Sequence, residues 1–374
     1  MLKRRFYKCF RTEQNRTEQN RTEQNRTEQN DSYNLVDVFK WIMAILVVML
    51  HACPLLDISE LADYYSSKGI TRIAVPYFFV ASGFFLFRKM PKGIFEWDIL
   101  KRYCVRLGKI YIAWGIIYLP MVMWQIYRSD DSLHAFLVVV RDTIFQGALV
   151  YHLWYLYASI LAALSLYFLF RSGMHLRSIL LLGLLLYMIP VAAYSYHGIY
   201  AYFFSDNNIL TIFLSYCQHF FRASNLWTIG VLYMAVGGIF AWNKVRYSQK
   251  QLAIFAVVSF LAYVAETVLL QQFDLYYKAN NSSYIMFVFV SCLFLLSIKV
   301  KLKDNYLYKI LREQSLFIYL VHPWFLFICS GIAKKLLGME QYHLPVFVAT
   351  LLLSVAVAEI LRRCREYKLV SWLC

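Results

Sequence analysis

Ten apolar runs constrain this sequence more than any other feature, because they approach the length needed to cross a lipid bilayer. A helix rises about 1.5 Å per residue, so about 20 apolar residues span the hydrocarbon core. The runs fall at about 34–54, 73–87, 110–127, 149–170, 178–198, 225–242, 251–271, 284–298, 314–333 and 344–361. The second and eighth are short, so their ends are the least defined. A further run, 209–221, suits a re-entrant or interfacial segment better than a crossing.

The composition excludes an ordinary soluble protein. Of the 374 residues, 60% are hydrophobic and only 16% are charged, whereas soluble chains are about 45–50% apolar and about 25% charged. The eight cysteines are scattered, without the close pairing typical of a metal site. We therefore expect an all-α, polytopic membrane protein with about ten transmembrane helices, surrounded by the lipid bilayer and without a metal or bound cofactor.

The positive charges predict the orientation of these helices. With the N-terminal tail inside, 30 of the 38 Lys and Arg residues fall in cytoplasmic segments and 8 in outer segments. Basic residues mark the cytoplasmic side of membrane proteins. Treating 209–221 as a crossing would place the later basic loops on alternating wrong sides. We predict that both termini are cytoplasmic, and that the net charge of +16 reflects topology and not nucleic-acid binding.

The chain divides into a tail, a membrane domain and a short end segment. Residues 1–33 form a cytoplasmic tail that contains four copies of Arg-Thr-Glu-Gln-Asn at 11–30. These repeats carry no apolar side chain, so we expect the tail to be disordered. The transmembrane domain is expected over 34–362, followed by a short cytoplasmic tail, 363–374. No cleavable signal peptide is expected, because the first basic residues precede the polar repeats and not an apolar run.

The repeat has a simple coding explanation. The five-base unit AGAAC, read in triplets, encodes Arg-Thr-Glu-Gln-Asn, and few peptide repeats can be encoded by so short a unit. Because five is not a multiple of three, gain or loss of one unit would shift the reading frame. We interpret the tract as a phase-variation switch of a bacterial gene. The alternative is an ordinary in-frame repeat of fifteen bases.

Two ionisable residues lie in the first apolar run, where such side chains are costly and usually functional. Lys40 and His51 are eleven residues apart, so they project from one face of a helix, about 16 Å apart along its axis. A neutral imidazole can take a proton from a hydroxyl group. A structural interpretation also fits, in which His51 is a hydrogen-bonded boundary residue and the Lys40 side chain extends to the membrane surface.

Five segments together resemble the membrane-bound acyltransferase-3 family. They are Lys40 with His51 eleven residues later, ITRIAVPYFFVASG at 70–83, the basic segment 101–107, HLWYL at 152–156 and SLFIYLVHP at 315–323. The resemblance covers about 34–362, with the segments in the expected order. It implies a ten-helix enzyme that moves an acyl group, usually acetyl, from cytoplasmic acyl-coenzyme A to a hydroxyl of an extracytoplasmic glycan.

The resemblance also implies roles for particular residues. His51 corresponds to the catalytic histidine, and Lys40 stands where the family has Arg or Lys. The family carries an Arg-x-x-Arg pair after the second helix; here Arg102 and Arg106 are four residues apart, and Lys101 precedes them. We expect Lys40, Arg102 and Arg106 to bind acyl-coenzyme A, because its phosphates attract cations; the alternative is a topology-setting basic loop. Some members carry a fused esterase-like domain, which we do not expect here.

Five further polar residues are candidates, each with more than one possible role. His322 and Tyr319, three apart on one helix face, would line the acceptor or acyl path or simply pack. Arg72 would meet an anionic glycan or His51, or would anchor the helix at the membrane surface. Glu266 is a lone carboxylate within the seventh run and a site candidate. His152, next to a tryptophan, indicates an interfacial belt more than a ligand.

These features predict a bacterial inner-membrane O-acetyltransferase. A phase-variable enzyme suggests an exposed product, so we expect the acceptor to be a surface polysaccharide, such as O-antigen or capsule, or its lipid-linked precursor. His51 would act as the base that activates the hydroxyl, or would carry the acyl group itself. The alternative is a transporter or flippase for a glycan or metabolite, although the internal duplication common in transporters is not evident.

The coding hypothesis predicts that the enzyme does not need its repeats. Deleting one Arg-Thr-Glu-Gln-Asn copy keeps the frame and removes side chains that bury nothing, so glycan acetylation should stay near the wild-type level. Deleting a single five-base unit should abolish the full-length protein, as measured by immunoblotting of membranes. Codons that do not follow the AGAAC repeat, or an in-frame deletion that abolishes activity at normal expression, would contradict the hypothesis.

Overall fold

The computed structural model of the chain describes residues 32–203, 208–221, 226–273, 283–338, 341–367, 370 and 372–374. The predicted disordered tail with its repeats at 11–30 lies outside the described residues, except for its last two positions. Within the described ranges every regular element is helical and none is a strand, which confirms the all-α prediction.

Eight helices in the described part of the chain are long and apolar enough to cross a membrane. They are α2 (Asn34–Ala52), Glu60–Phe87 with α3 (Glu60–Asp63) and α4 (Ala74–Phe87), α5 (Trp97–Tyr127), α7 (Trp154–Arg171), Leu176–Ser195 with α8 (Leu176–Pro190), α12 (Gln249–Gln272), Tyr306–Leu336 with α14 (Tyr306–Gly331), and α15 (His343–Arg363). Two shorter apolar helices are Ile229–Trp242, which contains α11 (Leu232–Trp242), and α13 (Tyr284–Lys299). All ten predicted runs are therefore helical, and the protein is a multi-pass membrane protein. The side on which each terminus lies stays a prediction.

Three helices begin well before their apolar runs: the second helix, α5, and α14, which starts at Tyr306 and not near 314. The second starts at Glu60 and continues through a π-helical turn, 64–69, and a 3-10 turn, 70–73. Polar side chains are satisfied locally there: the Ser67 hydroxyl donates to Asp63 at 2.7 Å, and the Thr71 hydroxyl donates to the Ser67 carbonyl at 3.0 Å. The third, α5, starts at Trp97, so the basic segment 101–107 is helical. Hydropathy locates the apolar part of a helix and misses such polar extensions.

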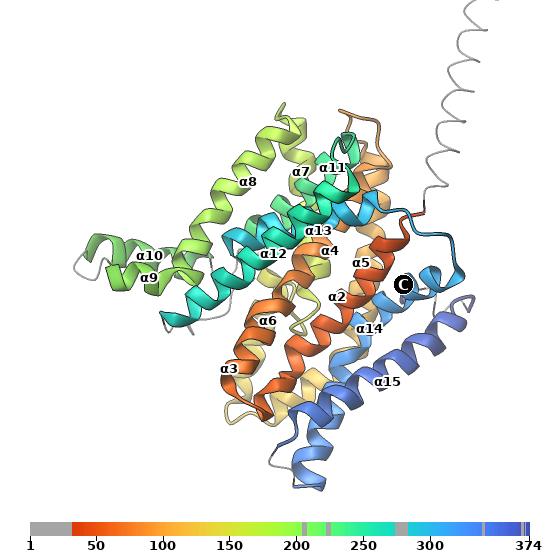
Figure 1. Cartoon of the computed structure of the whole chain (residues 1–374). Helices are drawn as coiled ribbons and strands as arrows, with labels where there is room; N and C mark the ends of the chain where they lie inside the picture. Colours follow the sequence, from red (N-terminus) through yellow and green to blue (C-terminus); the bar gives the residue numbers. More distant parts are fainter. Residues whose placement is uncertain are drawn as a thin grey trace, which may run out of the picture.

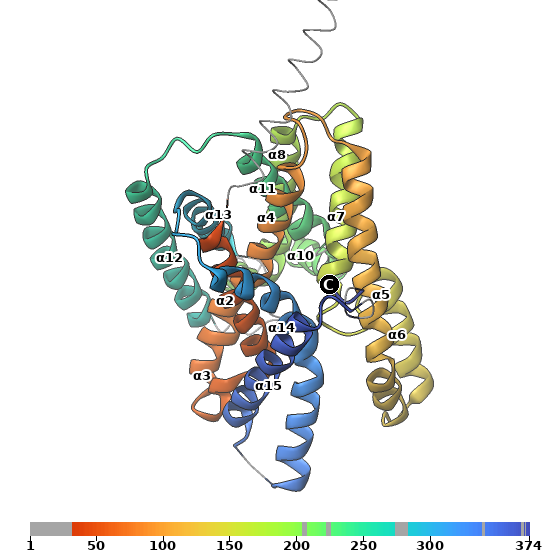
Figure 2. The same cartoon turned by 90° about the vertical axis from the view of Figure 1, so that its right-hand side faces the viewer.

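The helices pack around α2 and α4. α2 packs against α14, α15 and α4, and α14 and α15 lie side by side (Figure 1). In the perpendicular view α5, α6 (Ser132–Gln146) and α7 form one side and α12 and α13 the other, with α4 and α11 between them (Figure 2). α2 thus occupies an interior position, where Lys40 and His51 can meet residues from several other helices.

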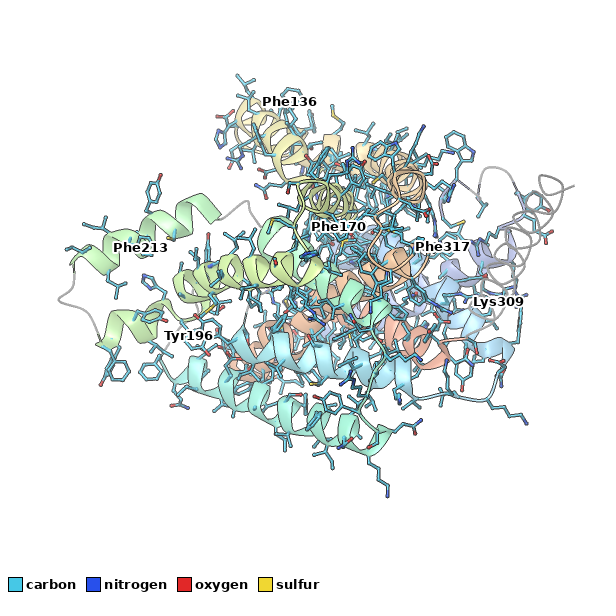
Figure 3. The ribbon with its side chains drawn as sticks, turned by 90° about the horizontal axis from the view of Figure 1, so that it is seen from above. Phe136, Phe170, Tyr196, Phe213, Lys309 and Phe317 are labelled. Carbon is cyan, nitrogen blue, oxygen red and sulfur yellow. The ribbon has the colours of Figure 1, made fainter. Side chains whose placement is uncertain are left out.

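The 209–221 run forms α10 (Asn208–Phe221), which is not among the helices long enough to cross the membrane. With the short α9 (His197–Phe203) it lies beyond one end of α8, beside the bundle (Figure 1). From above, Phe213 of α10 and Phe136 of α6 lie at the periphery, and both are about half exposed, whereas Phe317 of α14 lies among the packed helices (Figure 3). An interfacial or re-entrant position for α10 stays a prediction.

Glycines at the α4–α11 contact provide a test of this packing. A Cβ added at Gly83 would lie 2.1 Å from the Met234 carbonyl oxygen, and one at Gly237 would lie 2.1 Å from the Val80 carbonyl oxygen. Small residues allow membrane helices to approach this closely. Gly83→Ala or Gly237→Ala should therefore force the helices apart, at a cost of about 1–3 kcal/mol or more.

Thermal unfolding in detergent, followed by size-exclusion chromatography, measures this effect. Gly108→Ala in α5 is the matched control, because a Cβ there meets nothing within 4 Å. The two contact variants should unfold at clearly lower temperature than the control. Equal unfolding temperatures for all three would show that α4 and α11 do not pack as closely as the structure indicates.

Candidate active site at the centre of the bundle

The start of α2 is held by contacts with a distant segment, and its end is set by local sequence. At its start, the Ser32 hydroxyl and the Asn34 amide donate to Asp304 at 2.5 and 2.8 Å, and these hydrogen bonds lower the pKa of the Asp304 carboxyl. At its other end, Cys53 adopts a left-handed conformation (φ 49°) and Pro54 follows, so the helix stops at Ala52. His51 is consequently held in the last turn of α2.

His51 lies in a cluster of aromatic and imidazole rings from three regions of the chain. Its ring centroid is 4.4 Å from that of Tyr151 and 5.5 Å from that of His322 on α14, with the two imidazole planes only 16° apart. The His322 ring in turn lies 5.4 Å from that of His152. The fold therefore brings together three histidines that are distant in sequence.

The protonation of His322 follows from the proline beside it. In a regular helix the N–H of residue 323 would donate to the carbonyl of Tyr319, but Pro323 has no N–H. The Tyr319 carbonyl accepts instead from Nδ1 of His322, at 2.8 Å. A neutral ring with its proton on Nδ1 leaves Nε2 as a hydrogen-bond acceptor. Nε2 is buried and has no hydrogen-bond partner among the described residues.

His152 has a different place from the one its sequence predicts. An interfacial belt residue would face the lipid headgroups, whereas His152 is only 2% exposed, so that interpretation is wrong. Its ring packs edge-on against Tyr118 and Tyr319, at centroid distances of 5.1 and 5.4 Å. Neither ring nitrogen has a hydrogen-bond partner within the described part of the chain. Among the described residues, no group of three His, Cys, Asp or Glu side chains is arranged to hold a metal ion.

A cavity of about 730 Å³ extends towards this cluster from the end of the bundle where α2 begins; we call it the Lys40 cavity. The cavity is lined by Lys40, Arg102 and Arg106, the three residues that the family resemblance predicts to bind the donor. Arg312 and Asp37, which sequence reasoning missed, line it as well. With Lys89, which also lines it, five cations surround this one cavity.

Asp37 holds the cations of α2 and α14 in place. Its carboxylate oxygens lie 3.9 Å from Nζ of Lys40 and 3.6 Å from Arg312. Nζ of Lys40 also lies 4.3 Å above the ring of Phe85. The aromatic face and the single carboxylate stabilise the ammonium group without neutralising the whole cavity.

Tyr319 connects the Lys40 cavity with the histidine cluster. Together with Phe78 and Tyr155 it lines the cavity, and its hydroxyl donates to the backbone carbonyl of His152. Its ring lies 6.4 Å from that of His322. His51 is not among the residues that line the cavity, so the aromatic side chains stand between the cations and the imidazole.

The remaining candidates have separate positions. Arg72 donates from Nε to the Ser67 carbonyl at 3.1 Å, and its charge acts on the nearby His51. Glu266 is buried and accepts from the Ser283 hydroxyl and from the backbone N–H of Tyr284 at 3.0 Å. These bonds satisfy donors at the start of α13, so the structure gives Glu266 a helix-capping role.

Comparison with known proteins agrees with these features. A family model described as an acyltransferase domain matches residues 33–363. The chain therefore belongs to the acyltransferase-3 family, and it is a membrane acyltransferase by family. No solved structure matches it.

Curated relatives are similar at low identity. Two are named amino-acid racemase, from Enterococcus faecalis. One is 29% identical, covering 71% of this chain and 35% of the relative; the other is 26% identical, covering 90% and 47%. A serine/alanine racemase from Enterococcus gallinarum is 23% identical, covering 86% of this chain and 44% of the relative. The chain spans less than half the length of these relatives.

Proposed function

We propose that the protein is an O-acetyltransferase that moves the acetyl group of cytoplasmic acetyl-coenzyme A to a hydroxyl of an extracytoplasmic surface polysaccharide or its lipid-linked precursor. One observation carries the proposal. The cationic Lys40 cavity ends at Tyr319, which is packed against the histidine cluster that contains His51. A cavity suited to an anionic donor and a basic group thus lie on the two sides of one layer of aromatic side chains.

The donor enters with its phosphates near Lys40, Arg102 and Arg106. These cations form charge-assisted hydrogen bonds with phosphate oxygens, and arginine matches phosphate geometry best. The neutral arm of coenzyme A then lies along the apolar part of the cavity, which includes Phe78. The thioester reaches the cavity end at Tyr319, and movement of the aromatic side chains there admits it to His51.

The chemistry is acyl transfer with His51 as general base. His51 takes the proton of the acceptor hydroxyl as its oxygen attacks the thioester carbonyl carbon, which forms the ester C–O bond. The C–S bond breaks, and the coenzyme A sulfur takes the proton from the imidazolium. His322, stacked on His51 at 5.5 Å and held by its own bond to the Tyr319 carbonyl, fixes the orientation of the His51 ring.

The surface acceptor and the bacterial inner membrane are parts of the same proposal. The repeat at 11–30 supports phase-variable expression, which is useful for a modification that alters an exposed glycan. The racemase names belong to relatives more than twice as long as the region matched here, so we do not extend that activity to this chain.

His51 is the most direct test of the mechanism. His51→Ala and His51→Gln should both reduce ester formation by at least about a hundredfold, because general-base catalysis contributes about 10²–10⁴-fold. The measurement is transfer of labelled acetyl from acetyl-coenzyme A to polysaccharide in membranes with matched expression. His175→Ala is the control, since His175 is exposed just before α8. Wild-type ester levels in either His51 variant would rule out the assignment.

The cavity cations should act on donor binding. Lys40→Ala and Arg102→Ala should each raise the KM for acetyl-coenzyme A by about tenfold, because one charged hydrogen bond is lost. Lys40→Arg should keep activity, since the positive charge is retained. Steady-state kinetics with varied donor and acceptor separates the two substrates. A raised acceptor KM with the donor KM unchanged would show that the cavity does not bind the donor.

A further inference from the structure

A second cavity, of about 1,020 Å³, lies beside the Lys40 cavity. Its walls come from the end of α4 and the loop after it, from the segment 240–245 at the end of α11, and from the end of α13. Tyr33 and Lys89 line both cavities, so the two share a wall. We call the second one the Lys92 cavity; the sequence predicts its basic residues only as markers of the cytoplasmic side of the membrane.

The lining of the Lys92 cavity is strongly cationic. Among the described residues around it, six are positively charged and one, Glu96, is acidic. The cations are Arg88, Lys89, Lys92, Lys244, Lys299 and Lys301. A topology signal requires only that cations lie on one side of the membrane. Gathering six of them around one recess creates a positive potential that attracts a polyanion.

Neutral groups position several of these cations. Nζ of Lys92 donates to the Asn243 side-chain oxygen at 3.3 Å, and Nζ of Lys299 donates to the Val245 carbonyl at 3.4 Å. Because these acceptors are uncharged, they hold the ammonium groups at the wall without neutralising their positive charge. Each ammonium has three donors, so further N–H groups remain to bind phosphate oxygens.

The shared wall is itself built from a cation–aromatic contact. The Tyr33 ring has Arg88 at 4.6 Å and Lys301 at 4.5 Å from its centroid. The same ring packs edge-on against Phe84, at a centroid distance of 5.3 Å. A long ligand lying across this wall would place one end in each cavity, with its charged groups facing cations throughout.

We propose that the Lys92 cavity binds the 3′-phosphate of acyl-coenzyme A, while the diphosphate lies near Lys40 and Arg102. Coenzyme A suits this arrangement, because its 3′-phosphate is on the ribose, beyond the diphosphate and away from the thioester arm. The proposal rests on the proposed function and adds to it a separate subsite for the most distant charged group of the donor.

A third cavity is the alternative site for the 3′-phosphate. It has a volume of about 630 Å³ and is lined by Lys101, Arg102, Arg106 and Lys109. It is smaller than the Lys92 cavity and has fewer cations, and Nζ of Lys109 lies 5.3 Å from the centre of the Trp372 ring. Lys109 therefore provides a matched control, because its removal also deletes one lysine beside the Lys40 cavity.

The experiment compares acetyl-coenzyme A with its 3′-dephospho analogue, using wild type, Lys92→Ala/Lys244→Ala, Lys92→Arg/Lys244→Arg and Lys109→Ala in vesicles of fixed lipid composition. The double alanine variant should raise the KM for acetyl-coenzyme A by about tenfold or more, since it removes two charged contacts. Its KM for the dephospho analogue should change less than about twofold. The arginine variant should restore the lower KM for acetyl-coenzyme A relative to the dephospho analogue, and Lys109→Ala should keep this preference.

Other outcomes overturn the inference. The 3′-phosphate would bind elsewhere if the double alanine variant changed the KM for both donors equally or changed neither. The same conclusion would follow if Lys109→Ala lost the preference for acetyl-coenzyme A. Equal losses that recover when the fraction of anionic lipid is raised would indicate a lipid headgroup site. If wild type transfers acetyl from neither donor, the proposed function fails; if it transfers without the selective effect, only the 3′-phosphate subsite fails.

Discussion

Inside an apolar bundle, buried polar groups need partners within the protein, and this constraint determines where the candidate site forms. Pro323 lacks an N–H, so the Tyr319 carbonyl has no donor from the helix backbone and accepts from His322. That bond assigns the proton of His322 to Nδ1 and orients the ring that stacks on His51. One missing backbone donor on α14 thus helps to position a side chain on α2.

Much of the fold was predictable from hydropathy alone. All ten apolar runs are helical, because in a bilayer the backbone must satisfy its own hydrogen bonds and long apolar segments have few other conformations. The polar start of the second helix at Glu60 and the basic start of α5 at Trp97 were not predicted. Buried hydrogen bonds such as that of Ser67 with Asp63 hold the first extension, and the second carries exposed basic side chains, so neither leaves a signal in an apolar count.

The candidate site was predictable only in part. The spacing of Lys40 and His51 on α2 follows from helix geometry, and the family pattern named Arg102 and Arg106. The burial of His152 was missed, since a histidine beside a tryptophan also fits the membrane surface. Contacts between distant segments, such as Asp37 with Arg312, depend on helix packing and have no local sequence signal. For Glu266 the sequence signal pointed to a functional site, because it is a lone carboxylate in an apolar run. The structure instead shows it capping α13.

Transfer across the bilayer is the central claim, because it requires both the Lys40 cavity and His51. The most direct measurement uses oriented proteoliposomes, with acetyl-labelled coenzyme A added on the side of the Lys40 cavity and the polysaccharide trapped in the lumen. The account predicts labelled ester on the trapped acceptor with wild type and none with His51→Gln. Labelled acetyl-coenzyme A that enters the lumen unchanged, without ester on the acceptor, would indicate a transporter and contradict the account.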